Sequence, residues 1–547
     1  MSAWSRLTKL AVVAAGGHHA WQIHRQHQKN ALEGDKALVA AGVPLGDLET
    51  VRQRLARGQQ WVNPTLPSPL LTPPSYFPKV DDSTLRPPSL VTVHGPDTAV
   101  ITGPKNTDLV AVGGLHALLN ALYAAEQGCT VHYVSDGERP ILANAGQQLH
   151  PHPSQWPEYS MPYLLKVLAR SNYLMAPQDP RTWDYDSLHL PVRSWHDIRQ
   201  CMQNAAHFVE RQAVMWQSGA RVHPNDQALV ASIRDAIHTM TVLAADVYKV
   251  TGTSILQQEG RYYVGTSPEM GEKQRLWSAH GIPAQPVCGS EIARHTLLKE
   301  NHDYAGLYLP LDGKVSPHIV DSLCRYGHIK YGERFSVTRA RVTRIDAGEQ
   351  SSCVTYQQSG QPSRHLHASC AIVSLGHNRI LHRGQPLYTE TPIAGITSDW
   401  LCTVAVANLE KRLPPGKDLQ SFLDACGLRA CANVHNLHVK TQPEYMLSPD
   451  GTTVSLVVRV TEGGNYGRSV PDPNDLTSII SRVTTDFIGT WKLLRVGACA
   501  RKSTPENVPR VTSVGTTLFA YGQSGVGISW AGLNQLPALK LGPGKTR

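Results

Sequence analysis

The stretch Asp108–Asp136 reads DLVAVGGLHALLNALYAAEQGCTVHYVSD and decides the fold. A short apolar run leads into two glycines, a helix-forming segment with an apolar face follows, and Gly128 ends that segment before a second apolar run. Apolar runs of this length, separated by a segment of helical period, are typical of strands on either side of a helix. The pattern predicts a βαβ unit with two parallel strands.

A βαβ turn that binds a dinucleotide uses three small residues and an acidic residue about twenty positions further on. Counting back from Gly128, these positions fall on Val112, Gly114, Ala117 and Ser135. The first glycine and the acidic residue are therefore replaced. We expect their loss to cost about two to four powers of ten in affinity. A one-residue slip of the second strand would bring Asp136 to the ribose instead.

Composition describes an ordinary globular protein of more than one domain. The chain has 547 residues, 41% hydrophobic and 17% charged, with a formal net charge of +9. The positive charge is dispersed and forms no basic block, which argues against nucleic acid as a partner. The ten cysteines include no CxxC pair, and the closest two, Cys426 and Cys431, lack zinc-ligand neighbours. We therefore expect reduced thiols and no metal site.

The N-terminal segment is basic and contains no acidic residue from Met1 to Leu32. Its cations are accompanied by apolar residues at helical spacing, among them Trp4, Leu7 and Leu10. Such a segment resembles a mitochondrial targeting helix or a helix that contacts the inner-membrane surface. The apolar run LAVVAAGG is too short to span a bilayer alone. An ordinary amphipathic surface helix stays open as the alternative.

Nine prolines between Asn63 and Pro96 predict an extended strap after the N-terminal extension. Helical periodicity then dominates residues 155–250, and short alternating segments typical of strands follow from Ser254. We predict an N-terminal extension over 1–62, the strap over 63–101, a cofactor-binding domain over 102–200, 307–385 and 493–547, and a substrate domain over 201–306 and 386–492.

Four segments in this order resemble the FAD-dependent oxidoreductases of the D-amino-acid oxidase type, and especially the bacterial D-amino-acid dehydrogenases. They are the βαβ stretch, ANAGQ at 143–147, LYLPLDGKVSPHIVDSLCRYG at 307–327, and the C-terminal pair ARKSTPENVP and YGQSGVGISWAG. The resemblance covers about Asp108 to Leu536. It implies a mixed α/β fold in which a Rossmann-like FAD-binding domain is interleaved with an antiparallel-sheet substrate domain.

The resemblance also implies the site residues. Arg501 matches the arginine that grips the substrate carboxylate, although a surface or salt-bridging role is equally compatible. Cys499 and Lys502 replace the glycine and proline that flank this arginine in the family, and Ser524 replaces a glycine of the final turn. The flavin contacts implied are Gly113, Gly114, Ala117, Ser135, Asp136, Asn144, Ala145, Gly146, Gln147, Gly522, Gly525 and Gly527. For the glycines, fold maintenance is the competing interpretation.

Other candidate residues carry weaker signals. His377 and His382 follow a predicted strand, and Tyr262 and Tyr263 lie on a strand where core packing is the more common role.

Two hypotheses about function follow. In the first, the flavin site has decayed, FAD binding is weakened or lost, and the chain is a non-catalytic accessory subunit of a larger mitochondrial, respiratory-type complex at the inner membrane. In the second, it is an active FAD-dependent dehydrogenase of D-amino acids or related amines. Under the first hypothesis, restoring Val112→Gly and Ser135→Glu together is predicted to strengthen flavin binding.

Overall fold

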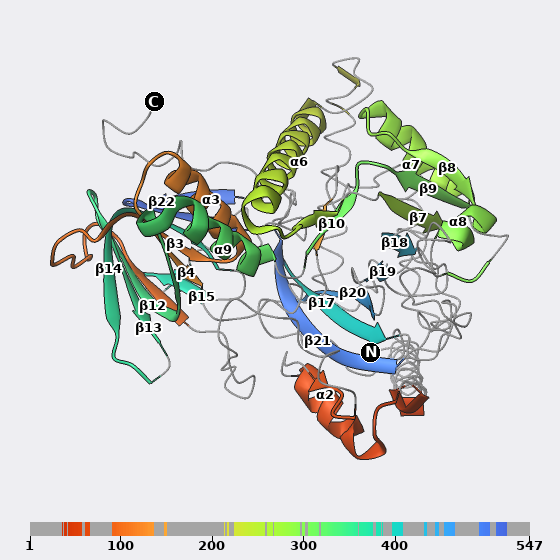
Figure 1. The fold of residues 1–547 in the computed structure, drawn as a ribbon, viewed down its shortest axis with the longest axis horizontal. Helices are drawn as coiled ribbons and strands as arrows, with labels where there is room; N and C mark the ends of the chain where they lie inside the picture. The colour runs from red at the N-terminus through yellow and green to blue at the C-terminus, as the bar shows by residue number, and fades with distance from the viewer. Residues whose placement is uncertain are drawn as a thin grey trace, which may run out of the picture.

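The protein is built on two large β-sheets, with helices at both ends of the molecule (Figure 1). The computed structural model describes residues 35–56, 61–65, 90–135, 147–149, 213–217, 224–300, 305–386, 397–407, 431–434, 443–447, 453–464, 492–503 and 510–521, apart from short gaps inside the longer ranges. Within them the fold is mixed α/β, as the sequence predicts, with one mainly parallel sheet and one mainly antiparallel sheet.

The large sheet has eleven strands and a parallel centre in the order β11-β4-β3-β14-β23. The first half of β14 pairs antiparallel with β13, and its second half runs parallel to β3 and β23. The members are β2 (Leu90–His94), β3 (Thr107–Gly113), β4 (Val131–Ser135), β11 (Phe335–Arg339), β12 (Arg341–Ala347), β13 (Ser352–Gln357), β14 (Arg364–Ser374), β15 (Arg379–His382), β16 (Gln385–Pro386), β22 (Arg510–Val514) and β23 (Thr517–Tyr521).

The predicted βαβ unit is confirmed: β3 and β4 are parallel neighbours joined by α3 (Leu115–Glu126). From Leu109 to Gly113 every residue of β3 is buried, which is typical of a parallel strand covered on both faces. At the other end of α3, Gly128 adopts a φ of +88° and its amide donates to the carbonyl of Ala125 over 3.0 Å. A glycine in this conformation closes a helix without steric cost. The helix therefore ends where the sequence pattern breaks.

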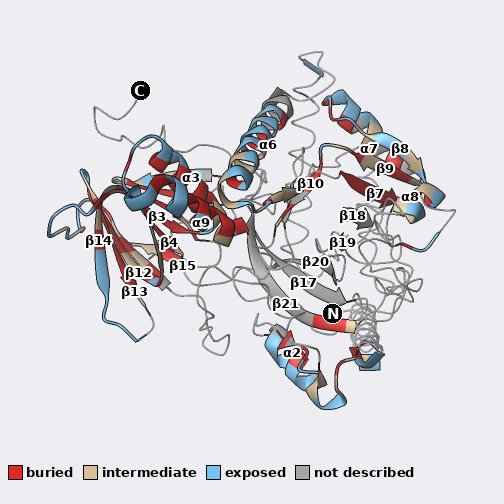
Figure 2. Cartoon of the chain, viewed as in Figure 1, coloured by how far each residue is buried: buried red, intermediate tan, exposed pale blue. Residues whose placement is uncertain are grey.

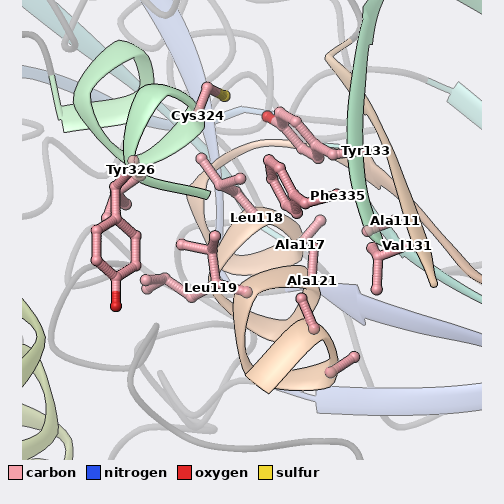
Figure 3. Close-up of a cluster of buried hydrophobic side chains, with 14 of the residues drawn as sticks. Ala111, Ala117, Leu118, Leu119, Ala121, Val131, Tyr133, Cys324, Tyr326 and Phe335 are labelled. Carbon is pink, nitrogen blue, oxygen red and sulfur yellow. The ribbon is translucent and has the colours of Figure 1, made fainter. Parts of the chain in front are cut away.

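Helices α3, α9 (Ile319–Tyr331) and α6 (Pro224–Thr251) pack side by side next to the large sheet (Figure 1). Their shared core, drawn in Figure 3, includes Leu118 of α3, Tyr133 of β4 and Phe335 of β11. A side-chain carbon at Gly327 of α9 would lie 2.7 Å from Leu122 of α3, so glycine permits the close approach of these helices.

A polar cluster ties the same three helices together at their solvent side. Lys330 of α9 lies 2.7 Å from the Asp246 carboxylate of α6 and 3.1 Å from the Glu126 carboxylate of α3. Hydrogen bonds from Lys330 and Tyr326 lower the pKa of the Asp246 carboxyl group, and hydrogen bonds from Tyr331 and Lys330 lower the pKa of the Glu126 carboxyl group. Because these charges are partly exposed, we expect each pair to contribute under about 1 kcal/mol.

The second sheet has nine strands in the order β1-β21-β17-β20-β19-β18-β7-β9-β8. Its longest members, β17 and β21, pair along most of their length and lie near the centre of the view in Figure 1. The members are β1 (Trp61–Val62), β7 (Arg261–Gly265), β8 (Gln285–Cys288), β9 (Ala305–Leu309), β17 (Thr397–Ala407), β18 (Cys431–Val434), β19 (Pro443–Leu447), β20 (Thr453–Gly464) and β21 (Lys492–Ser503).

Burial concentrates on the inner strands and on the helix faces turned toward them (Figure 2). Tyr263 of β7 stacks edge-on against Trp277 with ring centroids 4.8 Å apart. The remaining elements are a three-stranded sheet of β5 (Gln147–Leu149), β6 (Leu256–Gln257) and β10 (Gly313–Val315), the helices α2 (Leu48–Ala56), α7 (Ser267–Ala279) and α8 (Gly289–His295), and the 3-10 turns η1 (Leu45–Asp47) and η8 (Gly332–Arg334).

Some predicted boundaries differ from the extents of the sheets. Leu90–His94, assigned to the proline strap, forms β2 and lies between β12 and β15 in the large sheet. The reason is local: no proline interrupts 89–95, and LVTVH alternates as a strand does. The boundary at 493 falls inside β21, all of which belongs to the nine-stranded sheet. The next strand of the large sheet along the chain is β22.

The predicted extension contributes to the nine-stranded sheet, because β1 pairs with β21 and α2 contacts β21. Of the predicted helical region, α6 is confirmed, while residues 155–212 lie outside the described part of the chain. Met1–Leu32 also lies outside it. Within the described residues no helix combines the length and apolarity of a membrane-spanning segment.

Candidate functional site

The carboxyl ends of parallel strands in an open α/β sheet are the usual place for a ligand. Here β3, β4 and β14 end side by side, at Gly113, Ser135 and Ser374. The chain leaves β3 through Gly113 and Gly114 and enters α3 at once. Four residues of the predicted site, Gly113, Gly114, Ala117 and Ser135, are thus brought to one edge of the sheet.

Gly113 makes the tight turn. Its φ is +114°, and a side-chain carbon built on it would lie 2.1 Å from the carbonyl oxygen of Ser374. Only glycine accepts this conformation and this contact without strain. Two further bonds hold the turn: the Gly114 amide donates to Ser374 O over 3.0 Å, and the Tyr133 hydroxyl donates to Gly113 O over 2.6 Å.

The turn corrects the interpretation of Val112. This residue lies inside β3, opposite Val134 of β4 and Val373 of β14, and is completely buried in the core on one side of the large sheet. Among the described residues only Arg383 combines a side chain with a positive φ. Val112 is therefore not forced into a glycine conformation, and the expected penalty for its presence disappears.

The start of α3 offers partial positive charge. The N-cap Gly114 is exposed and has no side chain to bond the first amides, and no acidic residue lies in the first turn. Free amides and the helix dipole favour an anion at such an end. Ala117 is completely buried in the helix–sheet core, as the small residue at this position should be. These features fit a diphosphate group.

His116 occupies the second position of α3 and was missed from the sequence. Its side chain is 3% exposed, and neither ring nitrogen meets a hydrogen-bond partner among the residues that the structure describes. Burial lowers the pKa of His116 from 6.5 to about 4, so the ring is neutral at physiological pH. An unsatisfied buried polar group costs about 1–3 kcal/mol. The available signal was a polar residue in the first turn of a mainly apolar helix.

Ser135 stands at the end of β4, where the general dinucleotide-binding pattern has a carboxylate for the ribose. Its carbonyl oxygen accepts a hydrogen bond from the Ala340 amide over 2.9 Å, which fixes the strand end against the segment that follows β11. A serine hydroxyl offers a neutral hydrogen bond in place of a charge-assisted one. The turn after β3 therefore has the backbone geometry that a diphosphate needs, while the end of β4 offers a neutral hydroxyl in place of a carboxylate.

Other predicted residues belong to other strands. Gln147 begins β5 and pairs with Val315 in the three-stranded sheet. Arg501 lies in β21, in register with Asp399 of β17. His382 lies in β15, separated from β3 in the sheet order by β14, β13, β12 and β2. The predicted contacts outside the described residues are Asp136, Asn144, Ala145, Gly146, Gly522, Gly525 and Gly527, together with His377.

Tyr262 and Tyr263 are buried core residues of β7, as their position predicts. Arg261 beside them is fully buried, 3.3 Å from the buried carboxylate of Asp312, and donates to the Tyr263 hydroxyl over 3.1 Å. This pairing supports the strand rather than a site. In the described part of the chain, no three His, Cys, Asp or Glu residues gather as metal ligands.

Among the cavities lined by described residues are two that do not adjoin the turn. One, of about 500 Å³, lies beside Cys288 and Ser290, and the other, of about 260 Å³, runs along α6 near Tyr248.

Comparison with known proteins places the fold. The structure superposes on glycine oxidase from Bacillus cereus with a TM-score of 0.51 and 14% identity, over 81% of this chain and 98% of that one. Its fold is similar to that of the glycine oxidases. Glycine oxidase from Geobacillus kaustophilus gives a TM-score of 0.50 at 14% identity, covering 80% of this chain and 95% of that chain. At these identities the likeness shows the fold alone. No protein-family model matches the chain, and no curated protein does.

Proposed function

We propose that this chain uses an amino-acid oxidase fold as a scaffold, with a flavin site too weak to hold FAD at stoichiometry. It would serve as a non-catalytic subunit of a larger mitochondrial complex of the respiratory type. The observation that carries this proposal is Ser135, which ends β4 where a carboxylate would hold the ribose. Exchange of a charge-assisted for a neutral hydrogen bond costs about 1.5–3 kcal/mol, or about one to two powers of ten in affinity.

The estimate is smaller than the one from sequence because Val112 adds no strain. The buried and unpartnered imidazole of His116 supports the same conclusion, since a neutral ring at the helix start contributes no charge toward a diphosphate. Both features weaken the site without changing the fold around it.

The assembly and its location rest on the N-terminal sequence. A basic, acid-free segment from Met1 to Leu32 is suited to mitochondrial import or to contact with an anionic membrane surface. The helix α2 and the strand β1 follow this basic segment in the chain, and both pack on β21. The basic segment is therefore joined to the nine-stranded sheet by a short connection. If the chain binds a partner complex through this basic segment, its role in the complex does not depend on catalysis by the oxidase fold.

A second candidate is an active FAD-dependent dehydrogenase of a D-amino acid or related amine. The intact turn at Gly113 and the acid-free start of α3 favour it. Residues of the turn and of the first turn of α3 would hold the diphosphate. FAD, when bound, would supply the hydride acceptor for oxidation of the amine. Arg501 is the residue of this chain that would bind the substrate carboxylate.

The deciding experiment is an absorbance spectrum of the natively purified protein, followed by acid release and identification of any flavin. The protein is extracted from membranes with detergent for this purification, and size separation of the extract would show whether the chain migrates alone. The scaffold proposal expects less than about a tenth of an equivalent of FAD and migration within a large complex. One equivalent of FAD on a chain that migrates alone would overturn it and favour the dehydrogenase.

A further inference from the structure

His116 is a buried imidazole at a helix end that otherwise suits an anion. His116 is the second residue of α3, two residues after Gly114. Because side chains on a helix lean toward its N-terminus, we expect the ring to be directed toward the turn that Gly113 and Gly114 make. The exposed Gly114 opens this end of α3, while the ring itself is 3% exposed. Neither ring nitrogen has a hydrogen-bond partner within the described part of the chain.

The surroundings leave the ring uncharged and bring no countercharge. Asn120, one turn along, uses its amide to donate to the His116 carbonyl over 2.9 Å and so leaves the ring alone. Burial is the sole cause of the lowered pKa of His116. The titratable and charged groups on α3 and on the elements packed against it are Tyr123 and Glu126 of α3, Asp108 of β3, His132 and Tyr133 of β4, Arg364, His365, His367 and Cys370 of β14, and Asp321, Cys324, Arg325, Tyr326, His328, Lys330 and Tyr331 of α9. None of them contributes to the lowered pKa of His116.

We propose that His116 is a proton-coupled contact for the diphosphate of a dinucleotide: when the diphosphate binds, the ring takes up one proton from solvent and donates an N–H to a phosphate oxygen. This inference rests on the nucleotide site discussed under the proposed function, and it makes the low affinity of that site dependent on pH. At neutral pH the ring is neutral and binding is weak. In mild acid the protonated ring supplies the positive charge that the start of α3 needs.

Linkage fixes the direction of the effect. A bound dianion favours the imidazolium, so the pKa of His116 rises on binding from its value of about 4 in the free protein. At pH values between the pKa of His116 in the free protein and its pKa in the complex, lowering the pH by one unit tightens binding by at most about tenfold for the one proton taken up. Binding of the same ligand to a site with no titrating contact would show no such slope.

The test uses the full chain and ADP-ribose, which carries the diphosphate as a diester and lacks the flavin. Calorimetric titrations at about pH 6 and about pH 8 should show binding at least about fivefold tighter at the lower pH. Repetition in buffers with different heats of ionisation should show uptake approaching one proton per ADP-ribose near pH 6. The proton count needs no variant, so it stands even where a substitution at this buried position impairs folding.

His116→Gln should remove both the pH slope and the proton uptake. His132→Gln is the matched control, because His132 is half-buried and its pKa is also lowered to about 4, but its two ring nitrogens already bond Ser336 and Thr338. That variant should keep both effects.

Equal affinity at the two pH values, or an unchanged slope in His116→Gln, would overturn the inference. Failure of ADP-ribose to bind at either pH would overturn it too, while leaving the scaffold proposal standing. Stoichiometric FAD on the purified chain would have the opposite meaning, because it overturns the scaffold proposal and leaves the proton count to decide the role of His116.

Discussion

The hydroxyl of Tyr133 donates to the carbonyl oxygen of Gly113 over 2.6 Å, and both groups are buried. Through this bond β4 fixes the turn that leaves β3, while the bond from Gly114 N to Ser374 O fixes the same turn from β14. The two strands that flank β3 therefore set the backbone that leads into α3. The geometry of the turn belongs to the sheet as a whole, whether or not a nucleotide binds to it.

Gly113→Ala should destabilise the protein by at least about 2–4 kcal/mol. A non-glycine residue at φ +114° is strained, and its side-chain carbon would lie 2.1 Å from Ser374 O. Chemical denaturation measures the loss. Gly114→Ala is the matched control, because its φ is −85° and its side-chain carbon would lie 3.9 Å from the same oxygen. Similar losses for both variants would contradict the assignment of the tight turn to Gly113.

Val112→Gly should lower stability by about 2–4 kcal/mol and leave FAD affinity without gain. The side chain is completely buried between Val134 and Val373, so its removal opens a cavity and adds backbone freedom to the unfolded chain. Denaturation and FAD titration of the same variant check both parts. Tighter FAD binding in Val112→Gly would restore the original interpretation of this position as a lost turn glycine.

Ser135→Glu should tighten FAD binding by about ten- to a hundredfold, because a carboxylate at the end of β4 makes charge-assisted bonds to ribose hydroxyls. Fluorescence titration of added FAD against wild type gives the ratio. Ser135→Gln is the control of equal length without the charge, and it should gain less than about threefold. A Glu variant no better than the Gln variant would mean that the ribose lies elsewhere.

Sequence periodicity located the central βαβ unit correctly because its signals are local. The apolar run of β3, the helical period of α3 and the break at Gly128 each depend on neighbouring residues. The segment 307–327, matched to a strand, turn and helix, likewise holds β9, β10 and α9. Such elements are predictable, because the pattern of apolar residues within each segment indicates which of its side chains are buried.

Features that depend on distant strands were not predictable. Which of two adjacent glycines takes the positive φ is decided by the carbonyl of Ser374, far away in sequence. The strand β2 was hidden by the prolines on either side of it, although it pairs with β12 and β15. The burial of His116 likewise depends on tertiary packing, and spacing alone gives no information on whether a ring nitrogen finds a partner.

Acid should destabilise the protein well before its carboxylates titrate. Burial lowers the pKa of both His116 and His132 from 6.5 to about 4, so between these values the unfolded chain binds more protons than the folded one. The stability that these neutral rings allow is complete above about pH 6.5 and is lost as pH falls toward 4. Each histidine contributes up to about 3 kcal/mol over that window.

The carboxyl groups of Asp246 and Glu126 act in a different window. Their pKa values are lowered in the folded protein from 3.8 and 4.5, so their stabilisation is lost only below those values. Urea denaturation at about pH 7.5 and about pH 5 therefore isolates the histidines. His132→Gln should recover a substantial part of the loss at pH 5, whereas His238→Gln, at an exposed position of α6, should recover none. A loss of stability that persists in full in His132→Gln would show that this ring is not neutral in the folded protein.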